Sequence, residues 1–167
     1  AMCDWKSFVS LSYDGGGEEF SSVLSTVTEG VRQNVSKHKW PNSLGHFYST
    51  FTGFLGFKML EGEYKMMGLA PYGKPEYVDL ILENILTLNK NGTYKLNTKI
   101  CDYHSALQGK FNKRMILLFG DNRTTEEKLS QNHINIACSV QHVFELAQQN
   151  MFKSINNNKY SYKKLVL

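Results

Sequence analysis

The residues best suited to chemistry are Asp14, Gly15, Gly16 and Gly17, which follow a short stretch of alternating apolar and polar residues. Glycines let backbone amides approach a phosphate closely, and a carboxylate at the end of a strand can hold a metal ion or position a water molecule. The same residues would also form a β-hairpin with Asp14 and Gly15 at its turn. The pattern by itself leaves the phosphate site and the hairpin open.

A second group of polar residues, Glu61, Glu63 and Lys65, lies beside Gly62 and Gly68. Two carboxylates and an ammonium group in a glycine-bearing loop could bind a polar substrate or orient a phosphate. An ion pair on the surface would show the same residues. The residue types do not decide between a binding loop and a surface ion pair.

His46 falls in an apolar segment one helical turn before Thr50, and Tyr48 and Tyr72 offer hydroxyl groups. A histidine at this place could serve as a general base, or it could be a hydrogen-bonded structural residue. The other histidines are scattered without the spacing of a metal-binding pair, and the sequence contains no nucleophile elbow. The sequence therefore predicts no self-contained metal site.

Composition and charge narrow the class of protein. With 41% hydrophobic and 20% charged residues among 167, the chain has the balance of a single folded domain. The net charge of +4 is mild, so we expect no nucleic-acid partner.

The three cysteines, Cys3, Cys101 and Cys138, are odd in number and far apart. This spacing argues against a disulfide framework and against a zinc ribbon. No apolar run approaches the roughly 20 residues that span a bilayer, and no signal peptide is visible. We therefore expect a protein of the reducing cytoplasm that has no membrane partner.

The first forty residues, 1–40, predict an antiparallel meander that carries the Asp-Gly turn. Residues 8–13 alternate between apolar and polar types, as a half-buried strand does. A second strand over 19–28 and a third over 31–35 follow, separated by a Glu-Gly turn signal.

The middle of the chain, residues 41–131, predicts an inserted helical region. Ser43 can cap a helix whose apolar residues recur at three- and four-residue spacing, and that helix should end near residues 53–56. A short turn over 66–70 should precede a helix that begins near Pro75. Further expectations are apolar helix positions from Val78 to Leu86, a short strand at Tyr94 and Leu96, and either a helix or a strand over 115–119.

The last part, residues 132–167, predicts a long amphipathic helix over 132–155 that ends at the triplet 156–158. Residues 163–167 look like the opening of a buried strand. The whole pattern is that of one α/β domain over 1–167, with a mixed sheet that begins as an antiparallel meander and is flanked by helices.

Three stretches of the chain resemble the carbamoyltransferases of nodulation-factor and antibiotic biosynthesis, the NodU/CmcH family. The most specific stretch is SLGHFYSTFTGFLGFKMLEGEYKMMGLAPYG, residues 43–73. The other two occur in the order that the family has, and they are FVSLSYDGGGEE at 8–19 and INIACSVQHVFE at 134–145. Together the three stretches cover most of the chain.

The resemblance implies part of an actin-like ATPase fold, which is ribonuclease H-like and also occurs in tRNA-threonylcarbamoylation proteins. In such enzymes a carbamoyl group from carbamoyl phosphate is activated with ATP as a carbamoyl-adenylate. The group is then passed to a hydroxyl of a sugar or antibiotic-like acceptor. The expected small-molecule partners are therefore carbamoyl phosphate, ATP and a hydroxylated acceptor.

The resemblance also implies roles for particular residues. Asp14 matches the family aspartate that holds a divalent metal ion, iron or magnesium, near the nucleotide phosphates, and residues 15–17 match the phosphate-facing turn. His46 would be the base if it faces the cleft. Three residues of the 43–73 stretch are expected to contact nucleotide or acceptor: Glu63, Lys65 and Tyr72.

The family's upstream histidine motif and its adenylate-forming domain are missing from this sequence. We therefore expect a fragment that is inactive alone, binds no cofactor tightly and needs the missing parts of its own enzyme; a homodimer is compatible with this expectation. The alternative is a noncatalytic binding or assembly module of the same fold, in which residues 43–73 bind a partner. An actin-like sugar kinase comes third, because no adenosine-binding turn is recognisable.

Overall fold

A computed structural model of the chain describes residues 5–16, 18–156 and 164–166. Three strands, β1 (Ser7–Tyr13), β2 (Phe20–Thr28) and β3 (Val31–Lys39), form the predicted antiparallel meander. β6 (Leu165–Val166) pairs in parallel with β1, so the strand order is β3-β2-β1-β6. The predicted mixed α/β sheet is thus confirmed.

The hairpin between β2 and β3 shows how the local sequence sets the register. Thr28 lies opposite Val31, which leaves Glu29 and Gly30 as a two-residue turn. Both turn residues have positive φ, 47° and 80°, as the turns that match the twist of two antiparallel strands require. Glycine adopts this conformation at little cost, which explains its place in the turn.

The middle region is helical, as predicted, but it differs in detail. Its helices are α1 (Leu44–Phe54), α2 (Glu63–Leu69), η1 (Ala70–Tyr72), α3 (Val78–Asn84), α4 (Tyr103–Leu107) and α5 (Lys113–Phe119). The stretch 66–70, expected as a turn, belongs to α2 and η1, because fully buried Met66 anchors a helix there. Residues 115–119 are helical, since the Asn112 side chain accepts a hydrogen bond from the Arg114 amide and caps α5.

The helix predicted from Pro75 to Leu86 is shorter than expected. It ends at Asn84, and Leu86–Leu88 form β4, which pairs with β5 (Tyr94–Leu96) as a separate antiparallel ribbon. Ile85 and Leu86 are both buried, so the periodicity identified core positions but not the change of element.

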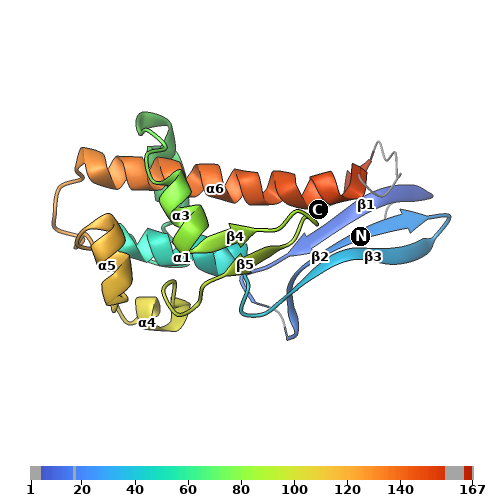
Figure 1. Cartoon of the computed structure of the whole chain (residues 1–167), viewed down its shortest axis with the longest axis horizontal. Helices are drawn as coiled ribbons and strands as arrows, with labels where there is room; N and C mark the ends of the chain where they lie inside the picture. Colours follow the sequence, from blue (N-terminus) through green and yellow to red (C-terminus); the bar gives the residue numbers. More distant parts are fainter. Residues whose placement is uncertain (1–4, 17, 157–163, 167) are drawn as a thin grey trace.

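The long helix α6 (Gln131–Asn156) ends at the first residue of the predicted stop signal, and Asn157 and Asn158 lie outside the described residues. Figure 1 shows α6 running along the molecule from the helices of the middle region towards the sheet, and it contacts α1, α2, η1 and α3. Buried residues along one side of α6 pack with fully buried aromatic rings of α1. The α6 residues are Ile136, Val140, Val143, Ala147 and Met151, and the α1 rings are Phe47, Phe51 and Phe54. Within the described part of the chain, no helix has the length and hydropathy needed to cross a membrane.

Candidate functional site

The Asp14 turn packs directly against the N-terminus of α1. Ser43 holds the two together, because its hydroxyl accepts from the His46 amide (3.1 Å) and donates to the Asp14 carbonyl (3.3 Å). The exposed Asp14 carboxylate accepts from the Gly15 amide at 2.6 Å. A carboxylate and a glycine turn therefore lie at the positive end of a helix dipole, where negative charge is stabilised.

Gly45 makes this packing possible. A Cβ atom at Gly45 would lie 2.9 Å from the Gly15 Cα atom, closer than real side-chain carbons approach. Only a glycine in the first turn of α1 lets the helix come this near to the turn. The glycine of the Ser-Leu-Gly motif is thus explained by close packing rather than by its own dihedral angles.

His46 lies beneath the same turn. Its Nε2 atom would be 3.7 Å from a Cβ atom built at Gly16, and its ring stacks on Tyr103 with ring centroids 3.8 Å apart. Trp40 meets the His46 ring edge-on, and the three aromatic residues line a hollow of about 240 Å³, here called the His46 hollow.

The charge state of His46 follows from its surroundings. Burial lowers its pKa most, His104 lowers it further, and Asp14 opposes both by raising it. The imidazole is therefore neutral at pH 7 and able to accept a proton. The structure brings together Asp14, Gly15, Gly16 and His46; Gly17 lies outside the described residues.

A groove of about 380 Å³ lies on the other side of Gly45 and is here called the Glu63 groove. Its lining comes from the end of β1 and from α1, α2 and α6: Tyr13, Gly45, Tyr48, Ser49, Glu63, Tyr64, Met67, Gln141 and Phe144. Gly45 therefore borders the turn on one side and the groove on the other.

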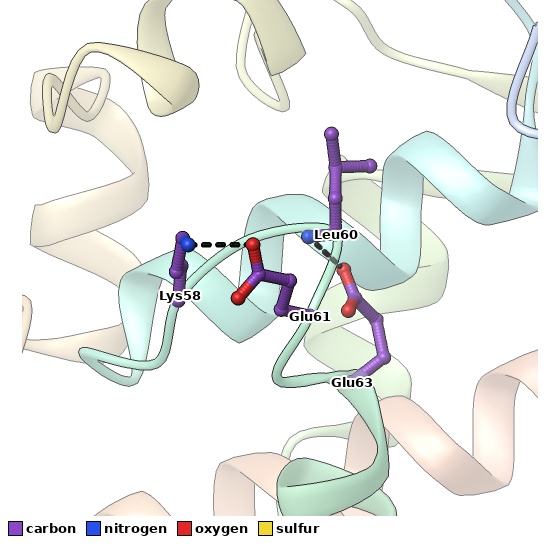
Figure 2. Close-up of polar contacts among 4 residues, drawn as sticks. All are labelled: Lys58, Leu60, Glu61 and Glu63. Atoms are coloured by element: carbon purple, nitrogen blue, oxygen red, sulfur yellow. Dashed lines mark hydrogen bonds and ion pairs between the residues drawn. The ribbon is translucent and has the colours of Figure 1, made fainter.

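The two carboxylates of the Glu-Gly-Glu loop have different surroundings. Glu61 forms an exposed ion pair with Lys58 at 2.5 Å, whereas Glu63 accepts from the Leu60 amide at 2.8 Å (Figure 2). Glu63 also accepts from the Ser49 hydroxyl at 2.6 Å. Glu61 therefore belongs to a surface ion pair, formed with Lys58 rather than Lys65, and a ligand-binding role for Glu63 stays a prediction.

Lys65 and Tyr72 do not share this groove. Lys65 lines a larger hollow of about 970 Å³ together with Phe57 and Arg123, and Tyr72 is 76% exposed in η1. The Arg123 guanidinium is held by the carbonyls of Leu55, Thr125 and Glu127, so it is committed to structure.

Three residues of this site were not predicted as such. Gln141 reaches the groove from α6, where its Oε1 accepts from the Tyr48 hydroxyl at 2.8 Å. Trp40 and Tyr103 frame His46. The Val-Gln pair in the stretch 134–145 was the only sequence signal for Gln141, and nothing in the sequence placed Tyr103 beside α1.

A metal ion would find few ligands here. Among the residues that the structure describes, no three His, Cys, Asp or Glu side chains come close enough to hold one. Asp14 could supply a single carboxylate, which is too little for a divalent ion. The described residues alone do not fit a metal site, and we derive no chemical step through one.

Replacing Ser43 by alanine should loosen the junction between the turn and α1. The change removes a helix cap and the bond to the Asp14 carbonyl, so we expect the free energy of unfolding to fall by about 1–2 kcal/mol. Urea denaturation measures this, with exposed Ser12→Ala as the matched control. Equal stability of the two variants would show that Ser43 does not hold the turn.

Comparison with known proteins shows which family the sequence is similar to. A family model described as carbamoyltransferase N-terminus matches residues 5–167. An uncharacterized protein of Synechocystis is 44% identical over 139 residues, which cover 81% of this chain and 22% of that protein.

Two nodulation proteins also match. NolO of Bradyrhizobium diazoefficiens is 32% identical and NolNO of Sinorhizobium fredii is 35% identical, each over 97 residues or 58% of this chain. These matches cover 18% and 14% of the two proteins. The matched parts of the chain thus span no more than about a fifth of the length of these curated relatives.

Proposed function

Because the chain belongs to the carbamoyltransferase family, we propose that it contributes part of the transfer site of an ATP-dependent O-carbamoyltransferase. The complete enzyme would pass a carbamoyl group from carbamoyl-adenylate, made from carbamoyl phosphate, to a hydroxyl of a sugar or antibiotic-like acceptor. The observation that carries this proposal is the match of the family model over residues 5–167, which include the Asp14 turn and the helix packed on it.

We assign the Asp14 turn to the nucleotide side of the reaction. The turn lies at the N-terminus of α1, where a phosphate or a developing oxyanion would be stabilised by the helix dipole. The chain's own residues supply only part of such a site, since the Gly15 amide already donates to Asp14. ATP, and a metal ion beside it, would need further ligands from elsewhere in the complete enzyme.

We assign His46 to proton removal. The acceptor hydroxyl oxygen forms a bond to the carbamoyl carbon, the bond from that carbon to the leaving phosphate oxygen breaks, and the hydroxyl proton passes to the imidazole. The neutral state of His46 and its position beneath Gly15 and Gly16 support this role.

The fold assignment follows the same proposal. Three antiparallel strands, a helix and a fourth strand that returns parallel to β1 are the order expected for half of an actin-like ATPase. We place the reaction in the cytoplasm, where carbamoyl phosphate and ATP are available. Exposed Tyr64 and Tyr72 favour the alternative, a binding or assembly module, which would not require turnover.

Transfer of radiolabelled carbamoyl groups tests the proposal. The complete protein that contains this chain is incubated with labelled carbamoyl phosphate, ATP, magnesium or iron, and a panel of sugar and aminoglycoside acceptors. We expect ATP-dependent labelling of a hydroxyl, established by mass spectrometry of the product. No labelling of any acceptor would favour the binding module, whereas labelling without ATP would contradict the proposed ATP dependence.

A further inference from the structure

The Glu63 groove has an unusual combination of walls for a sugar-sized hollow. Four aromatic rings line it, those of Tyr13, Tyr48, Tyr64 and Phe144, together with the Glu63 carboxylate. None of its lining residues is a lysine, an arginine or a histidine. The groove therefore offers π faces and negative charge to whatever enters it.

The direction of the hydrogen bond between Tyr48 and Gln141 can be worked out from Glu145. The Glu145 carboxylate accepts from the Gln141 amide nitrogen at 2.7 Å, so the Gln141 carbonyl oxygen must face Tyr48. That oxygen can only accept, and the Tyr48 hydroxyl must therefore donate to it. The Tyr48 oxygen keeps its lone pairs for another donor.

The same reasoning applies to Ser49. Glu63 Oε1 accepts from the Leu60 amide and from the Ser49 hydroxyl, which leaves the Ser49 oxygen as an acceptor as well. The hydroxyl protons of Tyr48 and Ser49 are thus both committed to the protein. The groove wall is mostly apolar, and the Tyr48 and Ser49 oxygens can still accept a hydrogen bond from a ligand.

The field at the groove also favours a cation. After burial, Glu145 and Glu63 are the next causes that raise the pKa of Tyr48, to about 12, so both carboxylates act at the Tyr48 hydroxyl. An ammonium group already lies near one wall, because Lys65 Nζ is 5.9 Å from the centroid of the Tyr64 ring. Lys65 lines the hollow beside Arg123, however, and not the Glu63 groove.

We propose that the Glu63 groove binds the ammonium group of an organic ligand. Aromatic faces attract cations, and a partly buried carboxylate with no neighbouring base in the groove supplies the counter-charge. If the proposed transferase function holds, this ligand is the acceptor, and the acceptor carries an amine besides its hydroxyl groups. The identification as acceptor rests on that function, whereas the binding itself does not.

Paired small probes test the groove without any turnover. The isotopically labelled chain is titrated at low ionic strength with n-butylammonium and with 1-butanol, and amide shifts are followed by NMR. We expect n-butylammonium to bind about tenfold more tightly than 1-butanol and to shift the amides of Gly45, Ser49 and Tyr64. Equal affinities, or shifts confined to other surfaces, would overturn the proposal.

Two matched pairs of variants test whether the preference for n-butylammonium arises in the Glu63 groove. Glu63→Gln keeps an acceptor for Ser49 and Leu60 but removes the charge, and it should reduce the tenfold preference to about twofold or less. Glu61→Gln, which removes an exposed carboxylate two residues away, should leave the preference unchanged. Likewise Tyr64→Ala should weaken n-butylammonium binding by about threefold and exposed Tyr72→Ala should not.

The amide spectrum of each variant reports whether it is folded, so a loss of binding can be separated from a loss of structure. If Glu61→Gln and Glu63→Gln reduce the preference equally, the cation is attracted by the general surface charge, and the groove proposal fails. A failure of this kind leaves the transferase assay unaffected, since that assay measures transfer in the complete protein. An inactive complete protein would in turn leave the NMR result standing.

Discussion

Gly73→Ala is expected to reduce the free energy of unfolding by about 3 kcal/mol. A Cβ atom at Gly73 would collide with the Ile134 carbonyl oxygen and would lie 2.8 Å from the Cys138 Cβ atom, both on α6. The segment cannot simply move away. The Lys74 and Tyr77 amides donate to Asn135 and Ser139 side chains of the same helix, each at 3.0 Å.

Gly68→Ala is the matched control, because the same change is made five residues earlier in the same motif. Nothing lies within 4 Å of a Cβ atom at Gly68, which is inside α2. Alanine is the better helix former there, so stability should stay level or rise by about 0.5–1 kcal/mol. Urea unfolding of both variants is the measurement, and equal losses would contradict the close packing of η1 on α6.

Acidification should destabilise the chain through His38, a buried histidine that lines neither the His46 hollow nor the Glu63 groove. Its Nε2 accepts from the Tyr94 amide at 3.2 Å, so its Nδ1 carries the proton and donates to Ser22 at 2.8 Å. Burial lowers the pKa of His38 from 6.5 to about 4. Protonation of His38 at Nε2 would remove the hydrogen-bond acceptor of the Tyr94 amide.

The sign and window follow from the two pKa values. Between pH 6.5 and about 4 the unfolded chain binds a proton at His38 that the folded chain does not. The stability contributed by neutral His38 is therefore complete above pH 6.5 and is lost as the pH falls to about 4. The loss is about 3 kcal/mol for a shift of this size.

His38→Gln isolates this contribution. Glutamine can accept from the Tyr94 amide but does not titrate, so the variant should be less stable at pH 7 and lose less stability on acidification. Denaturant unfolding at pH 7, 5.5 and 4 gives the slope of the unfolding free energy against pH for the wild type and for the variant. The difference between the two slopes removes the effects of His46 and His133, whose pKa values are also lowered. Parallel slopes for wild type and variant would contradict the assignment.

Local sequence patterns predicted much of the fold, because they act over a few residues. Alternation predicted β1, residue composition and a turn signal predicted the strands after it, and Ser43 was correctly identified as the cap of α1. The errors fall where tertiary packing overrides a local pattern. Ile85 and Leu86 continue a helical periodicity, yet they leave α3 because β4 pairs with β5.

The candidate site was predictable only in part. Asp14, Gly15 and Gly16 are neighbours in sequence. His46 lies beside them because Gly45, the residue before it, lets the N-terminus of α1 pack closely against Gly15. Spacing in sequence could not reveal that Glu63 and Lys65, two residues apart on α2, line different hollows.

Gln141 shows the same limit over a longer distance. It contacts Tyr48 across 93 positions of sequence, a separation that no local pattern reports. Its role became visible only through the packing of α6 on α1.

Carbamoyl transfer by the complete protein with Asp14→Ala tests most directly whether the glycine turn belongs to a transfer site. Exposed Asp79 in α3 is the matched control, since Asp79→Ala removes the same group away from the turn. We predict that Asp14→Ala lowers the rate at least tenfold while Asp79→Ala leaves it unchanged, with both variants folded. An undiminished rate in Asp14→Ala would contradict the account.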